Sequence, residues 1–318
     1  MKRITTACSI LMIVTMLGVT GGRTFAAHQA SPARAMQSVA LCSSTPYGVP
    51  ALQQLSQGIR NGLILATRVW KPKFHAIGVN LAGPYNYDDA RSDGVSYGTD
   101  QEHANALKCI ASNLTYGYIG TLNSGAAQVS EPILNNAGMV QISPANTGPV
   151  LTAPSSRASQ EPATYHHRLH YVTYYRTVTT DNLQGPTGAQ FMKNGLGAHK
   201  YFLVDDKTTY GAGLAQQMDL FAHNRLGMTR VGIGHIDPTD ASSIAQSSDA
   251  IADQVVSAKP DGVYCGCDSE NAIALARDLR NKGYTKPLVG GDALVNSSWV
   301  KLTGNGSIDN FATSVGPD

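Results

Sequence analysis

Residues 116–152, YGYIGTLNSGAAQVSEPILNNAGMVQISPANTGPVLT, contain the clearest structural pattern in this chain. An apolar run at 116–120 stops at a glycine, and Ser124 then stands in the N-cap position before a helical pattern of apolar residues. Gly138 lies where helices commonly end in a left-handed residue, and residues 139–142 form a second β-type run. The order strand, loop, helix, strand predicts two neighbouring strands of a parallel sheet.

The loops after these two strands carry polar side chains to one edge of the predicted sheet. Ser124 lies on the first loop, and Asn146 and Thr147 lie on the second. Ligands of open α/β sheets bind outside the carboxyl ends of the strands, where a helix N-terminus offers N–H groups to a carboxylate. Ser124 and Thr147 would equally suit plain structural caps, so the residues alone leave both readings open.

Strand and helix patterns alternate on both sides of this stretch. Before it, the sequence predicts strands at 39–41 and 76–81, helices at 51–69 and 102–114, a loop at 86–100, and an end of the first helix at 70–72, Trp-Lys-Pro. After it, the predicted helices are 189–196, 213–226, 242–258 and 271–282, and the strands are 201–204, 230–236, 262–265, 288–290 and 311–315. This alternation predicts an α/β protein with two βα domains, which we assign to residues 28–177 and 178–318.

The first 27 residues have the order of a secretory signal peptide. Lys2 and Arg3 precede an apolar stretch at 7–19, and small residues follow up to Ala26 and Ala27, where we expect cleavage. The apolar stretch is too short to span a bilayer, and no lipoprotein-type cysteine context is present. We therefore expect a soluble exported protein, periplasmic or extracellular.

Charge and cysteine content exclude several classes of function. Removal of the signal leaves 21 basic against 22 acidic side chains and no basic cluster, which argues against nucleic-acid binding. Cys42 and Cys109 are a candidate disulfide pair, whereas Cys265 and Cys267 are expected to be small apolar core residues without a zinc ion.

Motifs for catalysis or cofactor binding are weak. Gly211 and Gly213 resemble part of a dinucleotide fingerprint, but Gln216 takes the place of its third glycine. His166, His167 and His170 have no further ligand at metal spacing, so an interdomain strand is the expected role of that segment. No nucleophile motif is present, and we expect no enzyme activity, no cofactor and no metal.

Two acids, Asp268 and Asp292, follow predicted strands of the second domain. An isolated acid at a strand end is usually solvated or caps the next helix. If these carboxylates face the hydroxyls and helix N–H groups of the first domain, the pair of surfaces suits a zwitterion.

The segments IGTLNSGAAQVSEPILNNAGMVQISPANTGPVLT, DNLQGP, DDKTTYGAGLA, DGVYCGC and LVGGDALVN resemble the branched-chain amino-acid type of solute-binding protein, over residues 47–318. These type I periplasmic binding proteins serve ABC importers. The resemblance implies two Rossmann-like lobes with parallel sheets, joined by hinge strands, that close on a ligand. It assigns ligand contacts to the following residues: Ser124 for the carboxylate, Ala145, Thr147 and Asp292 for the amino group, and Tyr47, Tyr210, Asp268, Asn123 and Asn146 around the pocket.

The chain departs from the family pattern in three ways. Asp268 stands where relatives often have an aromatic residue, so the side-chain end of the pocket is expected to be more polar than one for leucine. The first strand, 39–41, is short for the family. The sequence stops at Asp318, about where the family crosses back to its first lobe, so we expect a C-terminally truncated chain whose first lobe exposes apolar surface.

The resemblance implies the binding component of an ABC importer, which captures an amino acid and presents it to a membrane permease. A ligand sensor on the same fold, for short amides or urea-like compounds, is the alternative, because both functions use the same cleft.

Overall fold

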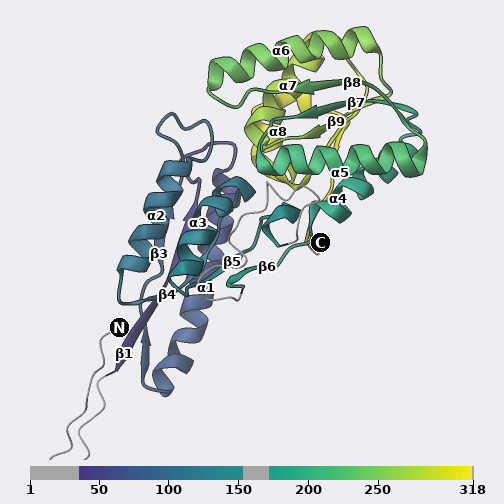
Figure 1. Ribbon diagram of the computed structural model, residues 1–318. Coiled ribbons are helices and arrows are strands. Elements are labelled where there is room, and N and C mark those ends of the chain that lie inside the picture. Colours follow the sequence, from purple (N-terminus) through teal and green to yellow (C-terminus); the bar gives the residue numbers. More distant parts are fainter. Residues whose placement is uncertain (1–35, 153–171, 317–318) are drawn as a thin grey trace, which may run out of the picture. The chain divides into compact units, whose positions relative to one another are not determined.

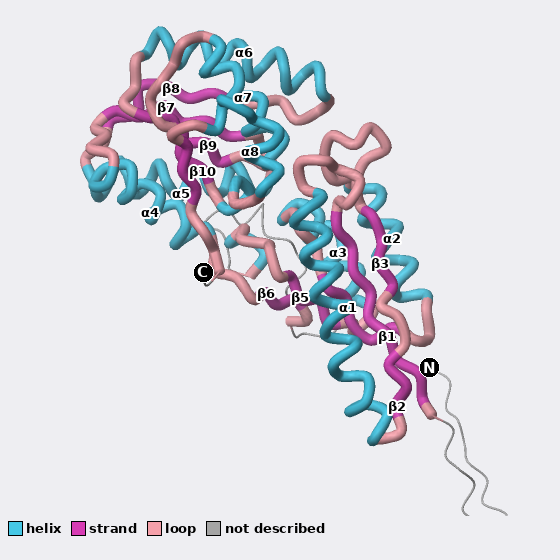
Figure 2. The backbone as a smooth tube through the Cα atoms, turned by 180° about the vertical axis from the view of Figure 1, so that it is seen from behind, coloured by secondary structure: helices cyan, strands magenta, loops and turns pink. Residues whose placement is uncertain are grey.

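The computed structural model describes residues 36–152 and 172–316, and it contains two parallel sheets with helices around them (Figures 1 and 2). The predicted signal peptide and His166, His167 and His170 lie outside the described residues. The α/β class with two parallel-sheet lobes is confirmed. Among the described residues, no helix has the length and apolar character needed to cross a membrane.

The first lobe contains the sheet β2-β1-β4-β5-β6, to which β3 is added by pairing with β1. Its strands are β1 (Gln37–Thr45), β2 (Val79–Leu81), β3 (Tyr85–Asp88), β4 (Thr115–Ile119), β5 (Val140–Ser143) and β6 (Tyr174–Arg176). Its helices are α1 (Gln53–Ala76), α2 (Thr99–Ala111) and α3 (Ser124–Asn136).

The two faces of the first sheet are covered unequally. Tyr118 is fully buried in the cluster that α2 and α3 contribute to, while the next residue, Ile119, borders a hollow lined by α1. Neighbouring residues of a strand point to opposite faces, so α1 covers the face away from α2 and α3 (Figures 1 and 2). The outer side of α1 leaves large apolar side chains exposed: Ile64, Leu65, Val69 and Trp70.

The second lobe contains the sheet β11-β10-β9-β7-β8. Its strands are β7 (Lys200–Asp205), β8 (Thr229–His235), β9 (Gly262–Gly266), β10 (Leu288–Gly290) and β11 (Asn310–Ala312). Its helices are α4 (Asp181–Gln190), α5 (Thr209–Leu226), α6 (Ala241–Ala258), α7 (Ser269–Asn281) and α8 (Ser297–Thr303).

Strand alternation explains why helices cover both faces of this sheet. Phe202 and Val204 of β7 pack with α6 and α7, whereas Tyr201 and Leu203 pack with α4 and α5. Figure 1 shows these helix pairs on opposite sides of the strands. Both faces are therefore buried, which accounts for the nearly continuous apolar run in β7.

Several expectations about local structure are wrong. The helix expected at 189–196 begins at Asp181 as α4, and residues 191–195 follow it as a π-helical turn. Helix α1 continues through Pro72 to Ala76, because its surface is exposed there and water can satisfy the carbonyl that proline leaves without a donor. Strand β1 has nine residues, because β2, β3 and β4 all pair along it. The polar segment 86–100 is not wholly a loop, since β3 extends to Asp88 and α2 begins at Thr99.

The cysteines form two disulfides in the described chain. Cys42 of β1 is bonded to Cys109 of α2, which confirms that candidate pair. Cys265 and Cys267 are both fully buried in the core, as expected, but they are bonded to each other. The sequence did not predict this bond, which joins Cys265 of β9 to the residue that directly follows the strand.

A buried carboxyl on α2, the helix that packs on the first sheet, makes the stability of the protein depend on pH. Glu102 of α2 is fully buried and accepts a hydrogen bond from the Tyr118 hydroxyl at 2.8 Å. Burial raises the pKa of Glu102 to about 7, so the folded chain holds a proton that the unfolded chain loses above its ordinary pKa. The stability contributed by this proton is complete in acid and is lost as the pH rises from about 4.5 to about 7.

We expect Glu102→Gln to reduce this loss, because glutamine keeps the shape and does not ionise. The free energy of unfolding, measured with urea at pH 5 and pH 8, should fall between these pH values by roughly 2–4 kcal/mol less in the variant than in the parent. Asp100→Asn, on the exposed side of the same helix, is the control. Equal pH dependence in parent and Glu102→Gln would contradict a protonated Glu102.

Candidate functional site

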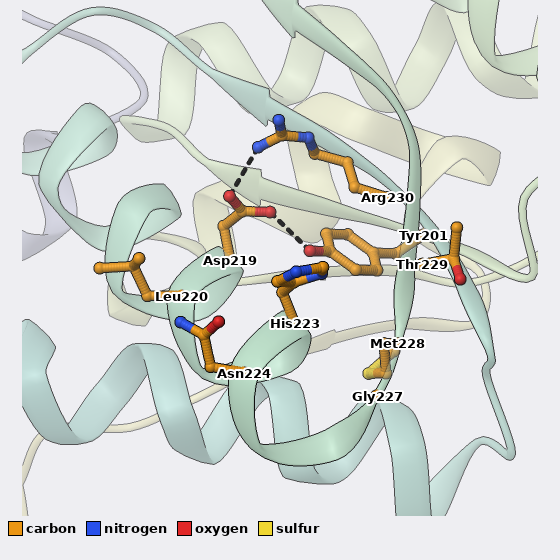
Figure 3. A pocket seen from close by; sticks show the side chains of 9 residues that line it. All are labelled: Tyr201, Asp219, Leu220, His223, Asn224, Gly227, Met228, Thr229 and Arg230. Carbon is orange, nitrogen blue, oxygen red and sulfur yellow. Dashed lines mark hydrogen bonds and ion pairs between the residues drawn. The ribbon is translucent and has the colours of Figure 1, made fainter.

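Three cavities of the described chain have an acid in their lining. One of them contains Glu270 together with Arg277. The other two differ in whether a cation pairs with the acid. The larger, in the second lobe, lies at the amino ends of β7 and β8 (Figure 3). Its carboxylate, Asp219, accepts a hydrogen bond from the Tyr201 hydroxyl at 2.5 Å and pairs with Arg230 at 2.6 Å. Its charge is therefore already balanced by neighbouring side chains.

A smaller cavity lies at the carboxyl ends of strands from both sheets. It has a volume of about 40 Å³, and its lining includes six of the residues predicted to contact a ligand: Asn123, Ser124, Ala145, Tyr210, Asp268 and Asp292. Leu52, Leu55, Leu122 and Ala293 complete it. The carboxyl ends of parallel strands are where ligands of open α/β sheets bind.

The first lobe contributes the N-terminus of α3 to this cavity. The structure places Asn123, not Ser124, at the cap position, so Ser124 is the first helical residue and the predicted cap is one position off. The Ser124 hydroxyl accepts a hydrogen bond from the Gly148 N–H at 3.1 Å, which ties the two predicted loops together. First-turn N–H groups have no partner within a helix, so this end of the cavity favours an anion.

Asp292 belongs to a hydrogen-bonded network of the second lobe. Its carboxylate accepts hydrogen bonds from the Tyr210 hydroxyl and the Gln184 side-chain amide, each at 2.9 Å. Gln184 also donates to Asp181 at 3.0 Å, so one amide bridges two carboxyls. Burial, with the neighbouring Asp292 second, raises the pKa of Asp181 to about 7. Burial also raises the pKa of Asp292, which the two hydrogen bonds partly oppose.

Asp268 faces the same cavity without a strong partner. It is 4% exposed, and one carboxylate oxygen accepts a hydrogen bond from the Asn123 amide of the first lobe at 3.1 Å. Its other oxygen has no partner among the described residues. Burial, then the charges of Glu270 and Asp206, raise the pKa of Asp268 well above its usual value.

Three predicted contact residues do not line this cavity. The Asn146 amide donates to the carbonyls of Thr121 and Leu122 and accepts from Tyr174, so it holds the loop together. The Thr147 carbonyl accepts the Asp181 N–H at 3.1 Å. The Tyr47 ring lies under the Arg60 guanidinium, 4.3 Å from its ring centre. Contact of these residues with a ligand stays a prediction.

Sequence reasoning missed the apolar wall and the supporting amide. Leu52 and Leu55 fall within the helix predicted at 51–69, where they read only as apolar helix residues, and Leu122 and Ala293 carry no chemical signal of their own. Gln184 lies in the quoted motif DNLQGP, so its role could be suspected only from the resemblance. Tyr97, whose hydroxyl occupies the space beside Gly125 at the start of α3, had no sequence signal.

Comparison with solved structures shows the class of protein that this fold defines. A leucine-binding protein, LivK, from Thermotoga maritima superposes with a TM-score of 0.66 at 19% identity, over 84% of this chain and 67% of that one. A type 1 periplasmic binding protein from Bordetella pertussis superposes with a TM-score of 0.67 at 13% identity, over 87% and 68%. The fold is that of type I periplasmic binding proteins.

Comparison with curated sequences confirms the narrower resemblance. A Leu/Ile/Val-binding protein homolog from Brucella melitensis is 25% identical over 196 residues, which are 62% of this chain and 48% of that protein. The chain is thus similar to the branched-chain amino-acid type of solute-binding protein. It spans about half the length of the curated relatives that it matches. No protein-family profile matches it.

Proposed function

We propose that this protein is an extracytoplasmic solute-binding protein that captures an amino acid in the small cavity and delivers it to the permease of an ABC importer. One observation carries the proposal: a helix N-terminus from one lobe and two carboxylates without a cation from the other line the same cavity. This polarity matches a zwitterion, with its carboxylate at α3 and its ammonium at Asp292. The name of the Brucella relative supports amino-acid binding, and the transport role is what the family resemblance implies.

The size of the cavity implies movement. A cavity of about 40 Å³ has room for a few water molecules but not for an amino acid, so an amino acid enters only when the walls separate. Hydrogen bonds from Asn123 to Asp268, and from Thr209 to Gln128 at 2.7 Å, join the lobes and would break on opening. Opening and closing of two lobes around a ligand is hinge motion, and the closed form would be the one that a permease recognises.

The proposal is tested by a thermal-shift screen of amino acids, their N-acetyl derivatives, and neutral amides including urea. Amino acids should raise the melting temperature, and N-acetylated forms should not. A response to neutral amides with none to amino acids would replace this proposal by the sensor function.

A further prediction concerns the carboxylate end of the ligand. Ser124→Ala should weaken amino-acid binding by about 1–3 kcal/mol, because a charged partner loses one hydrogen-bonding group. Isothermal titration measures the change, with Ser130→Ala, on the same helix and outside the cavity lining, as the control. Unchanged affinity would restrict Ser124 to its structural bond with Gly148.

A further inference from the structure

The ordinary structural roles of an aspartate do not account for Asp268. It stands at the N-cap position of α7, yet its side chain makes no capping hydrogen bond. It is 4% exposed, so water does not solvate it as it would a surface acid. No ion pair in the described chain includes it. An uncompensated buried carboxylate is costly, and its position here calls for a partner.

The neighbouring Asp206 shows how a structural acid is held in the same lobe. Its two carboxylate oxygens accept hydrogen bonds from the Asp268 and Thr208 N–H groups, the Thr208 hydroxyl and the Asn271 amide. Asp268 has one such bond, from Asn123, and one oxygen without a partner among the described residues. The fold thus supplies hydrogen-bond donors to both carboxylate oxygens of Asp206, but to only one oxygen of Asp268.

A second acceptor faces the same place. Asn123 is 4% exposed and also lines the cavity, and its amide nitrogen already donates to Asp268. Its carbonyl oxygen has no partner in the described part of the chain. Two buried acceptor groups, one of them a carboxyl that a cation would hold ionised, therefore border the cavity together. The group that satisfies both is a donor with positive charge.

The remaining lining fits the stem of such a group. Leu52, Leu55 and Leu122 are apolar and lie in the same lining as Asp268, so they can cover methylene groups while the charged end reaches the carboxylate. Asp292 and its Tyr210 and Gln184 partners are left for the α-ammonium. No lysine, arginine or histidine is in this lining to neutralise either acid.

We infer that the ligand is an α-amino acid with a cationic side chain, and that Asp268 and Asn123 bind its terminal ammonium or guanidinium. This inference rests on the proposed amino-acid function and names the substrate class of the same cavity. It differs from the amino acids named for the relatives above, which are leucine, isoleucine and valine.

Matched ligands test the inference on the unaltered protein. Isothermal titration compares L-arginine with L-citrulline, its neutral isostere, and L-lysine with L-norleucine, with L-leucine alongside. At least one cationic ligand should bind about 10- to 150-fold more tightly than its neutral counterpart, the range for a hydrogen bond to a charged group. Asp268→Asn should bring that ratio close to one, whereas Asp253→Asn, an exposed acid on α6, should leave it unchanged.

The possible results separate the inference from the function on which it rests. If leucine or the neutral isosteres bind as tightly as the cationic ligands, the inference is overturned and amino-acid binding stands. If no amino acid binds, the proposed function fails and the inference fails with it. Should Asp268→Asn not fold, the ligand ratios of the unaltered protein still decide.

Discussion

Asp292→Asn should weaken binding of the amino-acid ligand by about 2–5 kcal/mol, the range for removing one partner of a desolvated charge pair. The substitution keeps the shape of the side chain, and its amide oxygen can still accept from Tyr210 and Gln184. Only the charge that faces the ammonium is lost. Isothermal titration of parent and variant with the same amino acid measures the effect.

The same substitution should not weaken the fold without ligand. Burial and the charge of Asp292 both raise the pKa of Asp181, so removal of that charge relieves repulsion between two buried carboxyls. The melting temperature of the free variant should therefore equal or exceed that of the parent, which separates a binding effect from misfolding.

Asp219→Asn is the matched control, because Asp219 lies in the second lobe but is paired with Arg230 away from the cavity. The N-acetylated ligand should fail to bind the parent, since acetylation removes the ammonium. If Asp292→Asn binds as tightly as the parent, or acetylation makes no difference, the amino-acid function falls and neutral amides become the expected ligands.

Removal of the Cys42–Cys109 disulfide should lower the free energy of unfolding by about 4 kcal/mol, because the bond closes a long loop in the unfolded chain. The two cysteines are 67 residues apart in sequence, and they join β1 to α2 beside the buried Tyr118. Urea unfolding of the Cys42→Ala, Cys109→Ala double variant measures the loss.

The second disulfide supplies the control for this prediction. Cys265 and Cys267 are two residues apart, so their bond restricts the unfolded chain very little, although both side chains are equally buried. In the Cys265→Ala, Cys267→Ala double variant, the loss in the free energy of unfolding should come mainly from lost side-chain packing. If the two double variants lose the same stability, loop closure is not the source of the effect.

Local patterns were sufficient for most elements of both lobes, but β3 and α8 were not among the expected elements and α4 begins eight residues before the helix expected at 189–196. Gly138 adopts the left-handed conformation expected after α3, and Gly283 adopts the same conformation after α7. Asp240 caps α6 by accepting a hydrogen bond from the Ser243 N–H. These features depend on neighbours within a few residues, which a sequence displays directly. The prediction failed where pairing with strands distant in sequence determines the structure. Strand β1 is long because three strands pair with it, and β3 forms from a polar segment because it can pair with β1.

The sequence by itself determined that the chain alternates strands and helices, that Ser124 follows one strand of the first sheet, and that Asp268 and Asp292 follow strands of the second. Spacing along the chain contains that information. Only the tertiary structure decided which of these groups share a cavity, and that Asp206 is satisfied while Asp268 is not. The groups that bond to these two acids lie 62 and 145 residues away in sequence, and burial makes the Asp268 oxygen that lacks a partner energetically costly.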